Sequence, residues 1–182
     1  MGAESVLGLA QFDYSKTKYV PYEYFASMKR GVVEDQDVLL YKDGGRPGQF
    51  EPHVAMLGGG FPFRQFCINE HVYRLRARSP LTQEYLFCWL SSPPLLEEMR
   101  RYGTGVAIPG LNSSAVKALP IVVPPSDVLS GFAGVATALI RQALGVARES
   151  RSLTLLRDLL LPRLLCGELR VQSAEALVGE VV

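Results

Sequence analysis

Short apolar runs that end in turn residues fill the first part of the chain. Residues 37–41 (DVLLY) stop at residues 42–45 (KDGG), and residues 53–57 stop at three consecutive glycines. Apolar runs of this length, bounded by glycine and aspartate, are typical of short strands. The pattern predicts one strand in each run.

A clear two-residue alternation lies within residues 66–78. Arginine occupies every second position at Arg74, Arg76 and Arg78, and the positions between them are aromatic or apolar. Side chains of a strand alternate between its two faces, so the three arginines share one face. That face is either a solvated outer surface or part of a surface that follows a phosphate backbone.

The periodicity then changes to that of a helix. Leu81, Tyr85 and Trp89 recur at four-residue spacing, and Ser79 and Pro80 precede them as a cap and a first helical residue. Two serines and two prolines at residues 91–94 break this helix and begin a second one. We predict a pair of short helices here.

Two adjacent prolines at residues 124–125 mark a junction, because neither a helix interior nor a central strand accommodates them. A last short strand is predicted at residues 121–123. Beyond the junction, a long amphipathic helix is predicted over residues 126–161, about 50 Å in length. Pro162 is expected to kink or end it, and Gly167 to terminate any remaining turn.

Apolar residues of this helix recur at alternating steps of three and four, the spacing of a coiled-coil seam. The seam becomes polar at Ser150 and Arg151 and then resumes with a shift in phase. So long a helix overhangs the preceding domain, and its seam needs a partner in this chain or in another. The predicted interface residues are Leu129, Phe132, Ala136, Leu139, Ala143, Val146, Leu153, Leu156 and Leu160.

The composition is that of a globular protein, with 182 residues, 48% of them hydrophobic and 20% charged. The longest nearly uncharged helical stretch, residues 128–140, is too short to span a bilayer, and no secretory signal is evident, which favours a cytoplasmic protein. The net charge is +1, so nucleic-acid binding would need a local basic surface.

No complete active site or metal site is evident. Cys67 and His71 lie four residues apart without a metal-binding companion, and a catalytic pair would also need an orienting Asn or Asp. The glycine-rich segments match no phosphate-binding loop and favour tight turns, although backbone close to a phosphate chain, with Lys42 and Arg46 nearby, is the alternative. The residues favour a binding or assembly module, with a cysteine hydrolase as a distant alternative.

Three segments near the junction, taken in order, resemble a known family. They are GTGVAIPGLN at residues 103–112, VKALPIVVPP at residues 116–125 and LRDLLLPRLLCGELRV at residues 156–171. The series resembles the specificity (S) subunit of type I restriction-modification systems, and residues 32–48 and 67–77 are also similar to segments of that family. The chain lacks the usual opening block with tryptophan, and Ser126 begins its helix differently.

The resemblance implies an α+β fold. A compact mixed target recognition domain over residues 1–125 is followed by a long helix over residues 126–171, which pairs as an antiparallel coiled coil, and by a tail over residues 172–182. A full S subunit has two recognition domains and two helices, whereas this chain has one of each. A homodimer would restore that plan.

The resemblance also implies a function without catalysis. S subunits read a bipartite target in double-stranded DNA and dock methyltransferase (M) subunits, which use S-adenosylmethionine. A restriction (R) subunit supplies ATP-driven translocation and cleavage, so no cofactor is expected in this chain. The alternative is a truncated assembly or decoy protein that dimerises and binds M subunits without reading DNA.

We expect the DNA contacts on the first domain, on the arginine face, at the basic end of the second short helix and near the GTGVAIPGLN segment. The expected DNA-binding residues are Lys42, Arg46, Arg64, Arg74, Arg76, Arg100, Arg101, Thr104 and Asn112.

Overall fold

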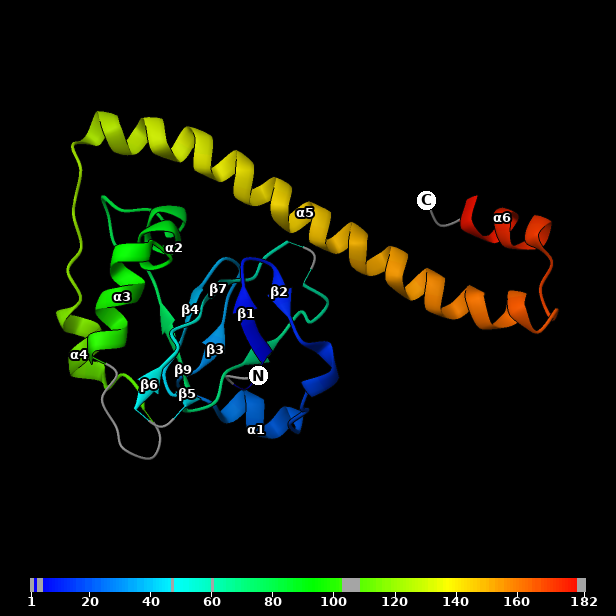
Figure 1. Cartoon of the computed structure of the whole chain (residues 1–182), viewed down its shortest axis with the longest axis horizontal. Coiled ribbons are helices and arrows are strands. Elements are labelled where there is room, and N and C mark those ends of the chain that lie inside the picture. The colour runs from blue at the N-terminus through cyan, green and yellow to red at the C-terminus, as the bar shows by residue number, and fades with distance from the viewer. Residues whose placement is uncertain (1, 3–4, 47, 60, 103–108, 180–182) are drawn as a thin grey trace.

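The computed structural model describes residues 2, 5–46, 48–59, 61–102 and 109–179. A domain of small antiparallel sheets and short helices is followed by one long helix that extends well beyond it (Figure 1). This mixed architecture confirms the predicted fold class, while the predicted pairing of the long helix with a partner helix stays a prediction.

A three-stranded antiparallel sheet lies at the centre of the domain, in the order β7 (Val54–Met56), β4 (Val38–Tyr41), β9 (Val72–Leu75). Both β4 and β7 were predicted as strands, and β9 lies within the predicted alternation. Three two-stranded ribbons surround the sheet. They pair β1 (Val6–Gly8) with β2 (Gln11–Phe12), β3 (Val32–Val33) with β8 (Phe66–Cys67), and β5 (Gly45–Arg46) with β6 (Gln49–Phe50).

Strand β4 is buried on both faces, which explains its uninterrupted apolar sequence. Val38 and Leu40 pack into one core cluster together with helix residues, and Leu39 packs into a second cluster on the other face with Ala55 and Ile68. Consecutive residues of a strand point to opposite faces, so one apolar run supplies both clusters.

Four short helices cover the sheets: α1 (Tyr22–Ser27), α2 (Gln83–Leu90), α3 (Pro93–Tyr102) and α4 (Ser113–Ala118). The predicted start of the first helix at Ser79 and Pro80 is wrong. Helix α2 begins at Gln83, because the Thr82 hydroxyl accepts the Tyr85 N–H at 3.2 Å and caps it. Helix α4, which we did not predict, begins where the Asn112 side chain accepts the Ala115 N–H at 2.8 Å.

The strand predicted at residues 121–123 is also wrong, since this segment pairs with no strand. Two aromatic side chains of α2 instead bind the backbone of the segment that joins α4 to the long helix. The Tyr85 hydroxyl donates to the Val122 carbonyl at 2.8 Å, and the Trp89 indole donates to the Pro120 carbonyl at 2.9 Å. The valine-rich sequence looked like a strand, yet its backbone is held by side chains.

The long helix α5 (Ser126–Leu165) continues through Pro162, so the expectation of an end near Leu161 is wrong. A proline lacks only its own N–H, and the Cys166 N–H still donates to the Pro162 carbonyl at 3.0 Å. Gly167, with φ of +75°, follows the last turn as predicted. The predicted tail contains a further helix, α6 (Val171–Gly179).

Helix α5 is long and apolar enough to cross a membrane by length and composition, with a mean hydropathy of 1.3 in its most apolar 18-residue window. The stretch at residues 128–140, which alone is too short for a span, is only part of this helix. A single helix of this kind is weak evidence for a membrane span, because core helices of soluble proteins share the property. In this chain one face of α5 packs against the domain.

That packed face, which we call the inner face, consists of Leu129, Ala136, Ile140 and Leu144. Ile140 and Leu144 belong to the same core cluster as Val38. Gly58 permits the close approach, because a Cβ there would lie 2.9 Å from the Leu144 Cδ1 atom. The inner face therefore fixes the helix to the domain through the domain's own core.

Two further contacts extend this attachment along α5. The Phe132 ring meets the Tyr85 ring edge-on at 5.5 Å. Near the far end of the domain, the Arg151 guanidinium lies over the Tyr14 ring at 4.0 Å. The attachment thus spans more than half of the helix, and the remainder extends past the domain (Figure 1).

Candidate nucleic-acid interface

One end of the domain brings together four basic residues of the predicted DNA-binding set and Asn112. We call it the hairpin edge and define it by Lys42, Arg46, Arg100, Arg101 and residues 109–112. Figure 1 shows the β5–β6 hairpin, the end of α3 and α4 side by side at this end. These segments are far apart in the sequence, so the edge forms only in the folded chain.

Backbone hydrogen bonds hold the centre of the hairpin edge. The Leu111 N–H donates to the Lys42 carbonyl at 2.7 Å, and the Gly44 N–H donates to the Pro109 carbonyl at 3.0 Å. On the other side, the Lys42 N–H donates to the His71 carbonyl at 2.9 Å. The backbone of Lys42 is therefore hydrogen-bonded to a neighbouring segment on each side, which fixes the point from which its side chain extends.

Glycine is required at two positions of the edge. Gly45 has φ of +102°, and a Cβ there would lie 2.0 Å from the Gln49 carbonyl oxygen across the hairpin. A Cβ on Gly110 would lie 2.5 Å from a carboxylate oxygen of Asp43. The glycine-rich segment thus forms a tight turn, as predicted, and it also places Arg46 on the exposed hairpin.

The arginines of α3 make only weak ion pairs. Arg100 lies 3.9 Å from Glu51 and 3.6 Å from Glu97, and Arg101 lies 3.8 Å from Glu97. Exposed pairs of this kind contribute little, about 0–1 kcal/mol, so a phosphate group can replace the carboxylates at small cost. Both guanidinium groups are therefore available to an anionic ligand.

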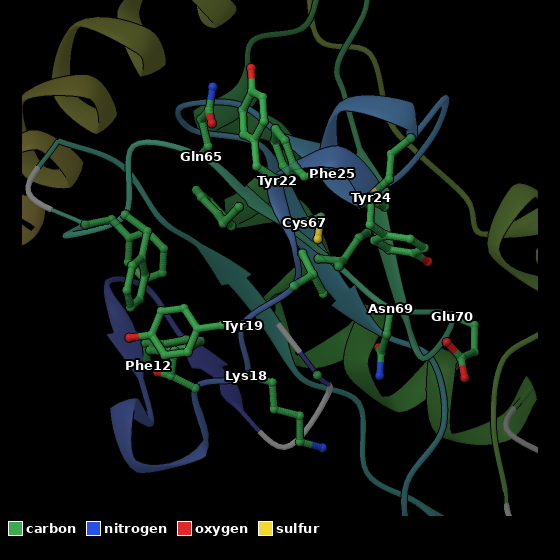
Figure 2. Close-up of a pocket in the computed structure, with 18 residues that line it drawn as sticks. Phe12, Lys18, Tyr19, Tyr22, Tyr24, Phe25, Gln65, Cys67, Asn69 and Glu70 are labelled. Atoms are coloured by element: carbon green, nitrogen blue, oxygen red, sulfur yellow. The ribbon is translucent and has the colours of Figure 1, made fainter.

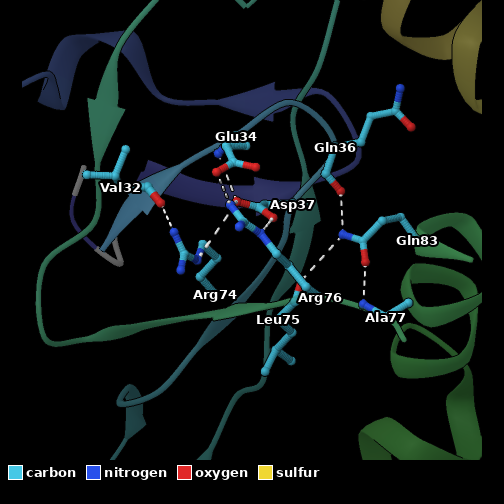
Figure 3. A network of polar contacts seen from close by, with 9 residues as sticks. All are labelled: Val32, Glu34, Gln36, Asp37, Arg74, Leu75, Arg76, Ala77 and Gln83. Atoms are coloured by element: carbon cyan, nitrogen blue, oxygen red, sulfur yellow. Dashed lines mark hydrogen bonds and ion pairs between the residues drawn. The ribbon is translucent and has the colours of Figure 1, made fainter. Parts of the chain in front are cut away.

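Arg74 and Arg76, by contrast, belong to an internal network (Figure 3). Asp37 is only 3% exposed, and Arg76 binds it with two hydrogen bonds, one of them at 2.8 Å between Nη2 and Oδ2. The hydrogen bonds to Asp37 raise the pKa of Arg76 above its ordinary value. Arg74 donates to the Val32 carbonyl and lies 3.9 Å from Asp37.

The network also reaches α2. The Gln83 amide donates to the Gln36 carbonyl at 2.8 Å, and its oxygen accepts the Ala77 N–H at 2.5 Å. The hydrogen bonds of this network thus connect the ends of β3, β4, β9 and α2. We expected the arginine face either in solvent or against DNA. Neither expectation included the buried carboxylate of Asp37.

Arg64, Asn112 and Thr104 complete the set of predicted DNA-binding residues. Arg64 lines a cavity of about 480 Å³ that it shares with Glu34 and Asp35. Asn112 lies on the hairpin edge, where its side chain caps α4. Thr104 lies outside the described residues. Contact of each of these residues with DNA stays a prediction.

His71 has a partner that the sequence could not indicate. Its Nδ1 atom lies 2.6 Å from an Asp43 carboxylate oxygen, and the two residues are 28 positions apart. This pair links β9 to the hairpin edge beside Lys42. Cys67, the other half of the proposed catalytic pair, lines a separate aromatic cavity. Among the described residues, no three His, Cys, Asp or Glu side chains gather in a way that could hold a metal ion.

The predicted helix interface divides between two faces of α5. Leu129 and Ala136 are buried on the inner face, and Phe132, Ala143, Leu156 and Leu160 are half-buried. Leu139, Val146 and Leu153 lie on an exposed face together with Val128 and Val135, and each of these five side chains is more than half exposed. We call these five residues the outer stripe.

Comparison with known proteins agrees with the family resemblance. No protein-family model matches the chain. The chain is 30% identical over 145 residues to the type I restriction enzyme MjaIX specificity subunit of Methanocaldococcus jannaschii, which covers 80% of this chain and 32% of that protein. It is 31% identical over 87 residues to the HindI specificity subunit of Haemophilus influenzae, which covers 47% of this chain and 19% of that protein.

Both relatives are specificity subunits, so the comparisons support the specificity-subunit family for this chain. The chain spans about a third of the length of the first relative and about a fifth of the second. The similarity to the first relative extends over most of the chain.

Proposed function

We propose that this chain is a non-catalytic specificity subunit that reads DNA sequence for a type I restriction-modification complex in the cytoplasm. The hairpin edge is the observation that carries the proposal. It combines the exposed Arg46, Arg100 and Arg101 with a half-buried Lys42, whose ammonium group lies over the Tyr73 ring. Clustered basic side chains are what contact with phosphates requires. The similarity to two specificity subunits supports the same function.

The DNA duplex would lie across the hairpin edge, and Arg46 would approach a groove from the tip of the β5–β6 hairpin. Lys42, Arg100 and Arg101 flank that hairpin and would contact phosphates. Phosphate contacts release counterions, so each one adds about one to the slope of binding affinity against salt. Arg74 and Arg76 would act indirectly by holding β9 against Asp37.

The outer stripe would pair two copies of this chain through α5. Its members are spaced mostly seven residues apart and share one side of the helix, while the inner face is already occupied by the domain. A two-fold dimer would place one recognition domain at each end of an antiparallel helix pair. Such a dimer would read one half-site twice, in inverted orientation, with a constant spacer.

The catalytic chemistry would belong to partner subunits. M subunits with S-adenosylmethionine would dock on the helix pair, and an R subunit with ATP would join through the assembled complex. This chain would hold neither cofactor.

The test is to co-express the chain with an M subunit encoded beside it and to sequence the methylated bases of the host DNA. We expect a symmetric bipartite target. An asymmetric target would show that a second, different specificity chain is the true partner. No methylation at all would contradict DNA reading.

A second variant set tests the spacer. A seven-residue insertion between residues 145 and 146 lies beyond Leu144, the last residue of the inner face, and within the outer stripe. Two complete turns keep the outer stripe in phase and lengthen the arm by about 10 Å. The spacer should lengthen while the half-site sequence stays the same. An unchanged spacer would contradict the proposed role of α5.

One observation favours the alternative, an assembly or decoy protein. Arg74 and Arg76 are committed to Asp37, and Arg100 and Arg101 each face a glutamate, so the field of the domain is weaker than its arginine content suggests. A decoy would dimerise and bind M subunits but would show no preference in a random DNA library. A specificity subunit would enrich one half-site, and the enrichment would fall with Arg46→Ala.

A further inference from the structure

An aromatic cavity of about 410 Å³ lies on the domain beside α1 (Figure 2). It is enclosed by α1, the segment at residues 17–20 and the segment at residues 61–70. Its volume lies within the range of about 300–1,000 Å³ that is typical of small-molecule sites. The function proposed above does not use this cavity.

Aromatic rings from separate segments form its wall. The Phe61 ring lies 5.2 Å from Phe12, 5.4 Å from Phe63 and 4.6 Å from Phe66. The Tyr19 ring continues the series, with its centre 6.3 Å from that of Phe63. These rings form one continuous surface of π faces and edges, which suits a flat aromatic ligand.

Tyrosines at the mouth of the cavity are exposed without a structural reason. Tyr19 is 82% exposed, and Tyr22 and Tyr24 are each more than half exposed. Exposed aromatic side chains that gather around one hollow mark a binding site, because the fold gains nothing from leaving them in water. Figure 2 shows the Tyr19 and Tyr22 rings at different sides of the cavity.

Polar groups stand at the edge of the same cavity. Gln65 lines it, and its amide makes no hydrogen bond with the part of the chain that the structure describes. Asn69 and Glu70 lie across the cavity from Gln65, and Lys18 stands at the rim (Figure 2). An amide presents a donor and an acceptor side by side, which matches the edge of a nucleobase.

We propose that this cavity is a binding site for one unpaired nucleobase, which stacks on Tyr19 and meets the polar groups at the rim with its edge. An aliphatic chain would match neither the ring-lined wall nor the amides at its edge. The base belongs either to a free nucleoside or nucleotide or to a single-stranded position in DNA. Both sources share the same ring chemistry.

The test uses 2-aminopurine, whose fluorescence falls when it stacks, in three forms: the free riboside, one position of a single-stranded oligonucleotide, and the same oligonucleotide fully paired. We expect saturable quenching with the riboside if free nucleosides are the ligand. We expect it with the single strand alone if a base in DNA is the ligand. A fully paired base should give no quenching in either case.

Tyr19→Ala should weaken this binding about tenfold, the effect of losing one stacking partner. Tyr19→Phe, which keeps the ring, should retain it. Tyr102→Ala is the matched control, because Tyr102 is an exposed tyrosine at the end of α3 and not in the cavity. Tyr19 is so exposed that its removal should leave the unfolding midpoint unchanged.

Absence of saturable quenching in all three forms would overturn the proposal, and so would quenching that Tyr19→Ala leaves unchanged. Quenching that high salt abolishes and that Arg46→Ala weakens would place the strand on the hairpin edge and would also overturn it. Duplex binding by the assembled complex is measured separately and depends on the hairpin edge. Failure of either proposal can therefore be told from failure of the other.

Discussion

Replacement of Arg76 by alanine tests whether the arginine face of β9 is structural. The substitution removes two charge-assisted hydrogen bonds from Asp37, which is 3% exposed and retains the Glu34 N–H at 2.8 Å. Each such bond contributes about 1.5–3 kcal/mol. Because the Arg76 side chain is 40% exposed, solvent screening reduces the sum, and we expect a loss of about 2–3 kcal/mol.

Urea unfolding can be followed through Trp89, the single tryptophan of the chain, which stacks on Tyr85 at 6.0 Å. A loss of this size corresponds to a fall in the melting temperature of about 4–12 °C for a domain of this size. Arg78→Ala is the matched control, since Arg78 shares the sequence alternation but makes no ion pair within the described residues. Its stability should stay within about 0.5 kcal/mol of the parent.

The refuting result is an Arg76→Ala protein as stable as Arg78→Ala. A double-mutant cycle with Asp37→Asn sharpens the test, because the cost of Arg76→Ala should shrink once the charged partner is gone. In the complex with M subunits, Arg76→Ala should leave the salt slope of duplex binding unchanged. A stable Arg76→Ala protein with a reduced slope would instead identify Arg76 as a phosphate contact.

Three further outcomes are expected. Gly45→Ala should destabilise the β5–β6 hairpin by about 2 kcal/mol or more, measured by urea unfolding, because its φ of +102° and the nearby Gln49 carbonyl exclude a Cβ. Burial, together with the charge of Glu84, raises the pKa of the Cys88 thiol. At pH 8 a disulfide reagent should therefore label the exposed Cys166 first and Cys88 more slowly, and equal labelling rates would refute this. Leu139→Asp should convert a dimer into a folded monomer in sedimentation, whereas Leu129→Ala should cost about 2–4 kcal/mol of stability.

The strands β4 and β7 could be predicted because local sequence determines them. Their apolar runs are bounded by glycine, and burial on both faces of the sheet requires no further information. The division of α5 into an inner face and an outer stripe was harder to predict. One seam was expected, but Leu129 and Leu139, both assigned to it, are ten residues apart and lie about 80° apart around a straight helix. The domain covers the side of Leu129 and leaves the side of Leu139 exposed.

The site was less predictable than the fold because it depends on contacts between distant residues. The arginine face looked like a basic surface, yet it binds Asp37, which lies 39 positions from Arg76. Nothing local to Asp37 shows that its carboxylate is buried. The valines at residues 121–123 likewise suggested a strand, because sequence alone does not show that tyrosine and tryptophan side chains of α2 hold that backbone.

Under the proposed role of α5 as a spacer between half-sites, the contact between Tyr14 and Arg151 has a mechanical consequence. From Leu129 to Arg151 the helix is held over about 33 Å, and it continues unsupported for about 21 Å to Leu165. A pivot at Leu129 would magnify a slip of about 2 Å at Arg151 into a displacement of about 3.3 Å at Leu165, close to one base-pair step of about 3.4 Å. The accuracy with which such an arm counts base pairs would then depend on how tightly a single arginine is clamped against a single tyrosine ring.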